Sequence, residues 1–199
     1  RYMNRKSNRK KVLILGAGEE MIPLMDIARA EGYLILATDR DCRSKGLAHA
    51  DVKFNLDATD AVNVLAIAVG HQIDAVLTRS ELLLPVVAYV CSKCGLPGPS
   101  EEVAALSVDK YLFRKKMATA KIRAPKFYMP EKASEVRPAI DVTGFPAIVK
   151  PVDFGGSNGV SKVTTLQEAK QAWENARQVS PSGRVIFEEL LKGREVSVE

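Results

Sequence analysis

Residues 145–163 place a lysine before a glycine-rich segment, between two short strand-like runs, and this order is suited to holding phosphate. The first run leads into Lys150 and Pro151, and the segment that follows contains Gly155, Gly156, Ser157 and Gly159. A P-loop has the opposite order, with its lysine after the glycines and a helix directly behind it. The sequence therefore predicts a nucleotide-binding site that is not a P-loop.

The composition is that of an ordinary globular protein. Of the 199 residues, 46% are hydrophobic and 27% are charged, as in most soluble domains. No apolar run approaches the ~18 residues of a membrane span, and no signal-peptide pattern is present. We expect no membrane partner. Because the chain does not begin with Met, we also expect a fragment, a processed chain or a tagged protein.

The net charge of +5 comes from the first eleven residues, and subtracting their six positive charges leaves −1 for the remainder. A nucleic-acid partner requires basic residues clustered on a folded face, which the rest of the sequence does not suggest. We therefore expect no nucleic acid, and we interpret residues 1–10 as a basic disordered arm or a tag remnant.

The three cysteines, Cys42, Cys91 and Cys94, do not form a disulfide framework. The pair Cys91 and Cys94 falls near the C-terminal end of an apolar helix, whereas redox thiols are activated at a helix N-terminus. A zinc site would need two further ligands, and the only histidines, His49 and His71, are scattered along the chain. Reduced cysteines and a cytoplasmic location are the expectation.

Residues 11–98 alternate strand-like runs with amphipathic stretches. The run 11–15 (KVLIL) is continuously apolar, which is typical of a strand buried on both faces of a parallel sheet. Further strands are expected at 33–37, 50–55 and 73–78, with helices at 19–31, at 58–70 and from Pro85. The pattern predicts an α/β domain with a parallel, doubly wound, Rossmann-like sheet, which ends at a Pro/Gly-rich segment near residue 98.

This first domain contains a glycine motif that is similar to a dinucleotide-binding fingerprint. The segment 16–18 (Gly-Ala-Gly) follows the first strand, and Asp39 lies about 20 residues further on. Against it, Met21 occupies the third glycine position, and Glu19 and Glu20 would repel a pyrophosphate at the helix N-terminus. An NAD(P)-binding module therefore stays open only as an alternative.

Glu19 and Glu81 follow two strands of this sheet, at the edge where ligands of open α/β sheets bind. An acidic pair at that edge suits a substrate that carries an amine. The other interpretation of Glu19 is that it complements its helix dipole.

Residues 99–199 change to a mixed pattern that predicts a two-layer α+β unit. Helices are expected from Ser100, at 107–121, at 131–140 and, after a capping box at Thr165, up to residue 178. Strands are expected at 125–129, 146–150, 184–188 and 194–199. Lys110 falls in the first turn of the helix 107–121, where the helix dipole opposes a cation. Most such lysines are solvated, and Lys110 becomes a candidate ligand-binding residue only through the motifs that follow it.

Four motifs in order resemble those of the ATP-grasp enzymes, and the resemblance covers residues 11–199. They are Asp109-Lys110, Phe145-Pro146-x-Ile148-Val149-Lys150-Pro151, the glycine segment Gly155 to Gly159, and Glu188-Glu189-x-Leu191-x-Gly193-x-Glu195. The resemblance implies that 11–98 is the domain that precedes the grasp fold, and that 99–199 is the N-terminal part of that fold, including its small subdomain.

The resemblance also implies an ATP site. Lys110 and Lys150 would reach the phosphates, and Gly155, Gly156, Ser157 and Gly159 would form a flap whose N–H groups cover them. Glu188 would accept from the adenine amino group. Backbone atoms of Glu189 and Leu191 would contact the ring edge, and Glu195 would bind the ribose hydroxyls.

The family's chemistry implies an ATP-dependent carbon–nitrogen ligase that also uses Mg²⁺. ATP would phosphorylate a small carboxylate substrate to an acyl phosphate, which an amine or another nucleophile then attacks. The magnesium ligands and a catalytic arginine lie in the family's later region, before which this chain stops. We therefore expect no metal ligands in this chain, an inactive fragment truncated before the large subdomain, and a homodimer for the full-length enzyme.

Within the family, the first domain is similar to carbamoyl-phosphate-synthase-like, biotin-carboxylase-like and glycinamide-ribonucleotide-transformylase-like members. Glu19 and Glu81 are similar to the amine-binding glutamates of the last group. An amino-acid or peptide ligase fits equally well. A kinase-like glycine loop would place its lysine after the glycines, and a non-catalytic nucleotide-binding or scaffold role stays open.

Overall fold

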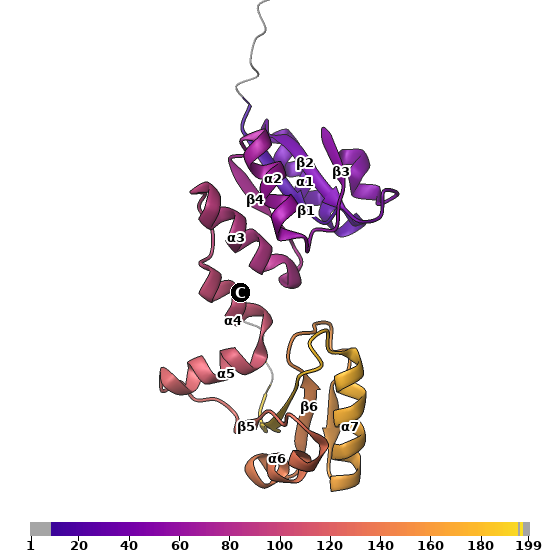
Figure 1. Ribbon diagram of the computed structural model, residues 1–199, viewed down its shortest axis with the longest axis vertical. Coiled ribbons are helices and arrows are strands. Elements are labelled where there is room, and N and C mark those ends of the chain that lie inside the picture. The colour runs from indigo at the N-terminus through magenta and orange to yellow at the C-terminus, as the bar shows by residue number, and fades with distance from the viewer. Residues whose placement is uncertain (1–8, 195, 197–199) are drawn as a thin grey trace, which may run out of the picture. The chain divides into compact units, whose positions relative to one another are not determined.

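The computed structural model describes residues 9–194 and residue 196. The chain divides between Ala105 and Leu106 into two compact units, which are shown in Figure 1. The sequence places a domain boundary near residue 98, and that limit stays a prediction.

The first unit is a parallel four-stranded sheet with the strand order β3-β2-β1-β4. Its strands are β1 (Lys11–Leu15), β2 (Leu34–Asp39), β3 (Val52–Asn55) and β4 (Ala75–Leu77). Its helices are α1 (Ile22–Ala30), α2 (Ala61–His71) and α3 (Leu84–Cys94), with short 3₁₀ helices at Glu19–Met21, Lys45–His49 and Glu81–Leu83.

Apolar side chains bury both faces of this sheet, which explains why its central strands lack alternation. Leu13 and Leu15 of β1 pack into a cluster with α2 and α3. Val12 and Ile14, which point to the opposite face, pack into a second cluster with Met25 of α1. The predicted parallel α/β architecture is confirmed.

The second unit is an antiparallel four-stranded sheet with the strand order β5-β8-β6-β7. Its strands are β5 (Phe127–Tyr128), β6 (Ala147–Pro151), β7 (Ser161–Val163) and β8 (Val185–Glu189). Its helices are α5 (Lys110–Thr119), α6 (Val136–Thr143) and α7 (Leu166–Val179), with a 3₁₀ helix at Ala133–Glu135. Helix α4 (Glu101–Val108) spans the division between the units.

The predicted helix 107–121 begins later than the sequence pattern suggests. Asp109 has an extended backbone, and its side chain accepts a hydrogen bond from the N–H of Leu112 at 2.8 Å. Asp109 is thus an N-cap that separates α4 from α5. The helix start at Thr165 is confirmed, because the Thr165 hydroxyl accepts from the N–H of Glu168. The Glu168 carboxylate accepts from the N–H of Thr164, one residue before the cap.

One face of the second sheet packs against helices, and the other carries charged side chains. Val149 of β6 and Phe187 of β8 point into a buried cluster with α6 and α7, which includes Trp173. Figure 1 shows α7 running beside β6. Because side chains alternate along a strand, Lys150 and Glu188 point to the opposite face, which α6 and α7 do not cover.

Part of the prediction lies outside the described residues. This applies to residues 1–8 of the basic arm, to most of the expected strand 194–199 and to Glu195. In the part of the chain that the structure describes, no helix is long and apolar enough to cross a membrane.

Candidate nucleotide-binding site

The register between β6 and β8 brings Lys150 and Glu188 together. Ile148 pairs with Glu188, and Lys150 pairs with Ile186, so the two charged side chains are diagonal neighbours on one face. The Lys150 Nζ lies 2.7 Å from the Glu188 Oε2. The sequence motifs that carry the two residues are almost 40 positions apart, and the antiparallel pairing makes them one site.

Helix α5 adds a second cation to the same carboxylate. The Arg114 Nε donates to the Glu188 Oε1 at 2.8 Å, and its Nη2 donates to Oε2 at 3.2 Å. Glu188 is only 4% exposed, a burial that is costly for a carboxylate without partners. Burial by itself would raise the pKa of Glu188, but the hydrogen bonds from Arg114 and Lys150 outweigh it and hold the pKa below its ordinary value.

Arg114 is the residue that the sequence interpretation missed. The signal for it was present, because Lys110 and Arg114 are four positions apart near the start of one helix. Two like charges at that spacing repel each other, and the helix dipole disfavours cations in the first turns. Such a pair on a short helix favours an anionic partner, and for Arg114 that partner is Glu188.

Lys110 joins the start of α5 to the beginning of the glycine segment. Its Nζ donates to the carbonyl of Phe154 at 2.8 Å and lies 3.4 Å from the carbonyl of Val152. Its backbone N–H also donates to Val152. Asp109 is buried beside it and pairs with Arg184 at 2.8 Å. These contacts place Lys110 directly before the glycines.

The glycine segment leaves β6, turns and returns as β7. Gly156 and Gly159 have φ angles of 68° and 72°, and Ser157 has 58°, a left-handed conformation that side chains disfavour. Among the described residues, no acceptor binds the N–H groups of Gly155 and Gly156. The turn therefore has backbone donors for an anion.

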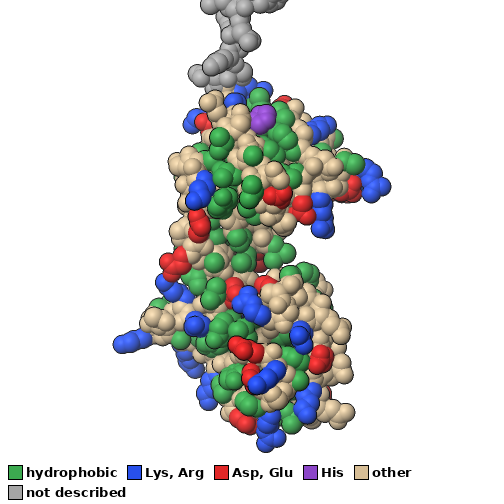
Figure 2. Space-filling model, in the orientation of Figure 1, with side chains coloured by type: hydrophobic (Ala, Val, Ile, Leu, Met, Phe, Trp, Pro, Cys, Tyr) green, Lys and Arg blue, Asp and Glu red, His purple; other side chains and the backbone are tan. Residues whose placement is uncertain are grey.

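The charge of the surroundings is positive. Arg114 and Lys150 share the single carboxylate of Glu188, so this cluster of three side chains, the Arg114–Glu188–Lys150 cluster, carries one positive charge in excess. Figure 2 shows Lys and Arg side chains along α5. Donors without acceptors beside an excess positive charge suit a phosphate group.

The segment after Glu188 meets the neighbouring strands through its backbone. The N–H of Glu189 donates to the carbonyl of Lys126 at 2.8 Å, and its carboxylate accepts from the N–H of Lys126 at 3.2 Å. Leu191 follows β8 and is exposed. The structure thus gathers Lys150, Glu188 and the residues after β8 at one sheet, while Glu195 lies outside the described residues.

The glycine motif of the first unit has a different environment. The N–H of Ala17 donates to the Asp39 Oδ2 at 2.8 Å, and the carbonyl of Ala17 accepts from the N–H of Gly46 and the hydroxyl of Ser44. The other oxygen of Asp39 accepts from the N–H of Asp41. In a dinucleotide site the Asp39 carboxylate would bind a ribose. Here both of its oxygens accept hydrogen bonds from backbone N–H groups of the first unit.

Glu19 and Glu81 lie after β1 and β4, which are neighbouring parallel strands. Glu19 forms an ion pair of 2.6 Å with Lys45, in which both side chains are mostly exposed. Glu81 begins a 3₁₀ helix and is also exposed. Both residues thus follow strands that end at the same edge of the sheet.

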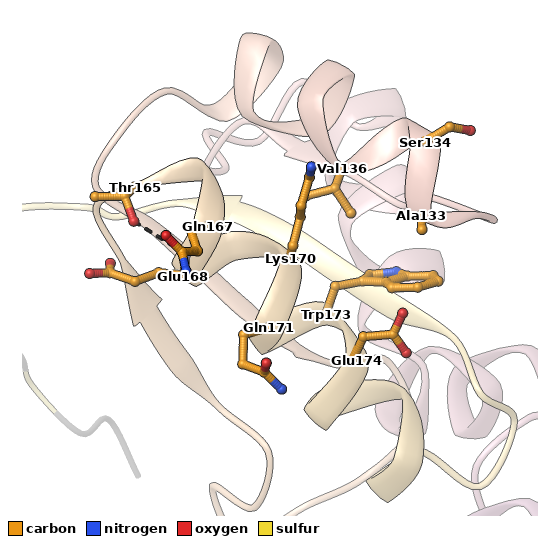
Figure 3. Close-up of a pocket in the computed structure, with 10 residues that line it drawn as sticks. All are labelled: Ala133, Ser134, Val136, Thr165, Gln167, Glu168, Lys170, Gln171, Trp173 and Glu174. Carbon is orange, nitrogen blue, oxygen red and sulfur yellow. Dashed lines mark hydrogen bonds between the residues drawn. The ribbon is translucent and has the colours of Figure 1, made fainter.

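A groove of about 870 Å³ lies elsewhere on the second unit, between the 3₁₀ helix Ala133–Glu135 and α7 (Figure 3). Figure 3 shows Trp173, Lys170 and Glu174 along it. Its lining includes neither of the two candidate lysines nor the glycine segment. It is therefore separate from the Arg114–Glu188–Lys150 cluster.

None of the described residues forms a group of three or more His, Cys, Asp or Glu side chains that could hold a metal ion. The donors in the site are nitrogen cations and backbone N–H groups, which bind anions. The described residues of this site therefore do not form a magnesium site.

Residues 117–199 match the family described as "D-ala D-ala ligase C-terminus". A formate-dependent phosphoribosylglycinamide formyltransferase of Prochlorococcus marinus (strain MIT 9313) is 30% identical over 187 residues, which are 92% of this chain and 48% of that protein. The chain thus spans about half the length of this relative.

Solved structures share the fold across both units. The phosphoribosylglycinamide synthetase from Anaerococcus prevotii matches with a TM-score of 0.66 and 23% identity, over 94% of this chain and 47% of that one. The biotin carboxylase domain of the Hydrogenobacter thermophilus 2-oxoglutarate carboxylase matches with a TM-score of 0.75 and 19% identity, over 92% and 44%. In its family match, its relatives and its fold, this chain is similar to proteins of the ATP-grasp superfamily.

Proposed function

We propose that the chain forms the nucleotide-binding part of an ATP-dependent carbon–nitrogen ligase. The observation that carries this proposal is the Arg114–Glu188–Lys150 cluster with its excess positive charge, which shares β6 with a glycine turn whose N–H groups lack acceptors. The matched Hydrogenobacter structure holds MgADP and bicarbonate, which supports a nucleoside phosphate as the ligand.

In this proposal the residues of the second unit bind and orient ATP. The ammonium groups of Lys110 and Lys150 hold phosphate oxygens, and the N–H groups of Gly155, Gly156, Ser157 and Gly159 cover them. Glu188 accepts from the adenine amino group, since its Oε1 accepts one hydrogen bond, from Arg114, within the described residues and has room for a second. The backbone of Glu189 and Leu191 contacts the ring edge, and Glu195 binds the ribose.

The reaction we propose is phosphoryl transfer from ATP to a small carboxylate, followed by attack of an amine on the acyl phosphate. The described residues contribute by holding ATP in place and by neutralising its charge. Mg²⁺, when bound, would supply further neutralisation at the phosphates. The metal ligands would have to come from outside the described residues.

Glu19 and Glu81 are proposed to bind the amine of the second substrate. Both follow neighbouring parallel strands, so both acidic groups are at one edge of the first sheet. The named substrate of the Prochlorococcus relative, phosphoribosylglycinamide, contains an amine.

A homodimer is also proposed, as in the biotin carboxylase domain dimer. The free thiols of Cys42, Cys91 and Cys94 support a reducing, cytoplasmic location.

Nucleotide binding is tested by titrating ATP into the 199-residue chain and following backbone amides by heteronuclear NMR. The chain should bind ATP and should not bind NAD. Lys150→Ala should weaken ATP binding on the order of tenfold, since one charge–phosphate contact is lost.

The matched control is Lys170→Ala, because Lys170 is exposed on α7, the helix that covers the other face of the sheet. It should leave ATP affinity unchanged. Equal ATP affinity in the Lys150→Ala, Lys170→Ala and unaltered chains, at unchanged melting temperature, would refute the role of Lys150.

A further inference from the structure

Arg114 makes a two-pronged contact with one buried carboxylate. Its Nε and Nη2 donate to separate oxygens of Glu188 at 2.8 and 3.2 Å, the geometry of a bidentate arginine–carboxylate pair. Its Nη1 donates to the Met117 sulfur at 3.4 Å, and its guanidinium carbon lies 5.7 Å from the centroid of the Phe113 ring. The guanidinium is thus fixed on α5, and it fixes Glu188 in turn.

The bidentate contact of Arg114 with Glu188 changes the net charge beside Lys150 that a ligand meets. A lysine paired with one carboxylate forms a neutral pair, and a phosphate has to compete with that carboxylate. Here Glu188 is shared with Arg114, so the three side chains keep a net charge of +1. Their side chains are only 20%, 16% and 5% exposed for Arg114, Lys150 and Glu188, so solvent screens this charge weakly.

The donors of Lys150 fit the same interpretation. Its ammonium carries three hydrogens, and within the described residues it donates to the Glu188 Oε2. Because Arg114 holds the carboxylate from the other side, Glu188 cannot turn to take up more of these donors. Two ammonium hydrogens remain for an oxyanion.

We infer that Arg114 is a positioning residue, which fixes Glu188 and keeps the ammonium of Lys150 available to a nucleotide phosphate. The inference rests on the proposed nucleotide-binding function. It assigns Arg114 no contact with the nucleotide, and its effect on binding passes through the carboxylate and Lys150.

The test uses inorganic tripolyphosphate, which has no base, titrated into the 199-residue chain. Arg114→Met, which keeps much of the side-chain volume, should lower tripolyphosphate affinity on the order of tenfold because the cluster becomes neutral. Arg114→Lys keeps the positive charge but loses the bidentate contact, and its tripolyphosphate affinity should be close to that of the unaltered chain. Loss of affinity that is equal in both variants would overturn the inference.

The double variant Arg114→Met/Glu188→Gln separates charge from packing. Removing the carboxylate together with the guanidinium restores the net +1 on Lys150, so tripolyphosphate affinity should return to within about threefold of the unaltered chain. A role of Arg114 in packing alone predicts no recovery. A double variant that binds no better than Arg114→Met would contradict the inference.

A ligand-free measurement distinguishes this inference from the proposed function. The ¹³C signal of the Glu188 carboxylate, followed against pH, should show a higher pKa in Arg114→Met, because a stabilising cation is gone. An unchanged pKa of Glu188 would overturn the inference, regardless of which ligands the chain binds.

If the unaltered chain binds tripolyphosphate and Arg114→Met binds it equally well, only the inference fails. If the unaltered chain binds neither ATP nor tripolyphosphate, the proposed function fails and this role of Arg114 fails with it.

Discussion

The chain contains two glycine turns that each follow a strand, and their surroundings differ in hydrogen bonding and in charge. In the turn 16–18 the N–H and the carbonyl of Ala17 are both bonded, to Asp39 and to the 44–46 segment. In the segment 155–159 the N–H groups of Gly155 and Gly156 have no acceptor among the described residues. The two turns share glycines but differ in the bonding of their backbone and in the charges beside them, and for this reason we propose the anion site at the second turn.

The same contrast appears in the charged residues beside each turn. Glu19 and Glu20 follow the first turn, and Glu19 pairs with Lys45 at the surface. Lys110 contacts the beginning of the second turn, and Lys150 lies on the strand before it. Substitutions in the two regions should therefore affect different properties of the protein.

The largest effect is expected from Glu188→Ala. It removes the shared carboxylate and leaves the partly buried cations Arg114 and Lys150 without their anion. Breaking such a pair from one side should cost about 3 kcal/mol in the free energy of unfolding, measured by urea denaturation. Glu174→Ala on the exposed face of α7 is the control and should cost less than about 0.5 kcal/mol. Equal costs would mean that the cluster does not stabilise the fold.

Asp39→Ala should have the next largest effect, and it should leave nucleotide binding unchanged. The change leaves the N–H groups of Ala17 and Asp41 without an acceptor, which should lower the free energy of unfolding by about 1–2 kcal/mol. ATP affinity should stay the same, because the turn 16–18 is not part of the proposed site. Weaker ATP binding in a folded Asp39→Ala chain would contradict that separation.

The pH dependence of stability should distinguish Glu188 from the exposed acids. The pKa of Glu188 is lower in the folded chain than its ordinary value of 4.5. Its stabilising contribution is therefore fully present above pH 4.5 and is lost as the pH falls through the lower folded value. Urea midpoints measured between pH 3 and pH 7 should fall more steeply at the acid end in the unaltered chain than in Glu188→Gln. Parallel curves would show that Glu188 does not contribute to acid unfolding.

The smallest effect is expected from Lys45→Met. The ion pair between Lys45 and Glu19 has an N–O distance of 2.6 Å, but both side chains are about 70% exposed. Exposed pairs of this kind contribute about 0–1 kcal/mol, so the melting temperature should hardly move. A loss as large as that of Asp39→Ala would show that the acidic end of the first sheet depends on this contact.

Local patterns predicted much of the fold. The continuously apolar run in β1 indicated a strand buried on both faces, and Thr165 with Glu168 indicated the start of α7. These features are local in sequence, so propensity and capping reveal them. Asp109 was harder, because its role as a cap depends on a backbone conformation that the helical pattern around it conceals.

The site was predicted less completely, because its contacts join distant segments. Lys150 and Glu188 stood out from their motifs, but their pairing depends on the register of β6 with β8. Arg114 reaches Glu188 across 74 positions, and its only local signal is the four-residue spacing from Lys110. The hydrogen bonds of Ala17 could not be predicted either, since Asp39 and Gly46 come from other segments.

Amide NMR of the 199-residue chain during an ATP titration tests the contrast between the two turns most directly. The amide signals of Gly155, Gly156 and Ser157 should shift with a single binding curve, while those of Gly16, Ala17 and Gly18 stay in place. The same curve should weaken in Lys150→Ala. ATP-dependent shifts that are confined to residues 16–18, or that are absent from 155–159, would contradict the assignment of the nucleotide site to the second unit.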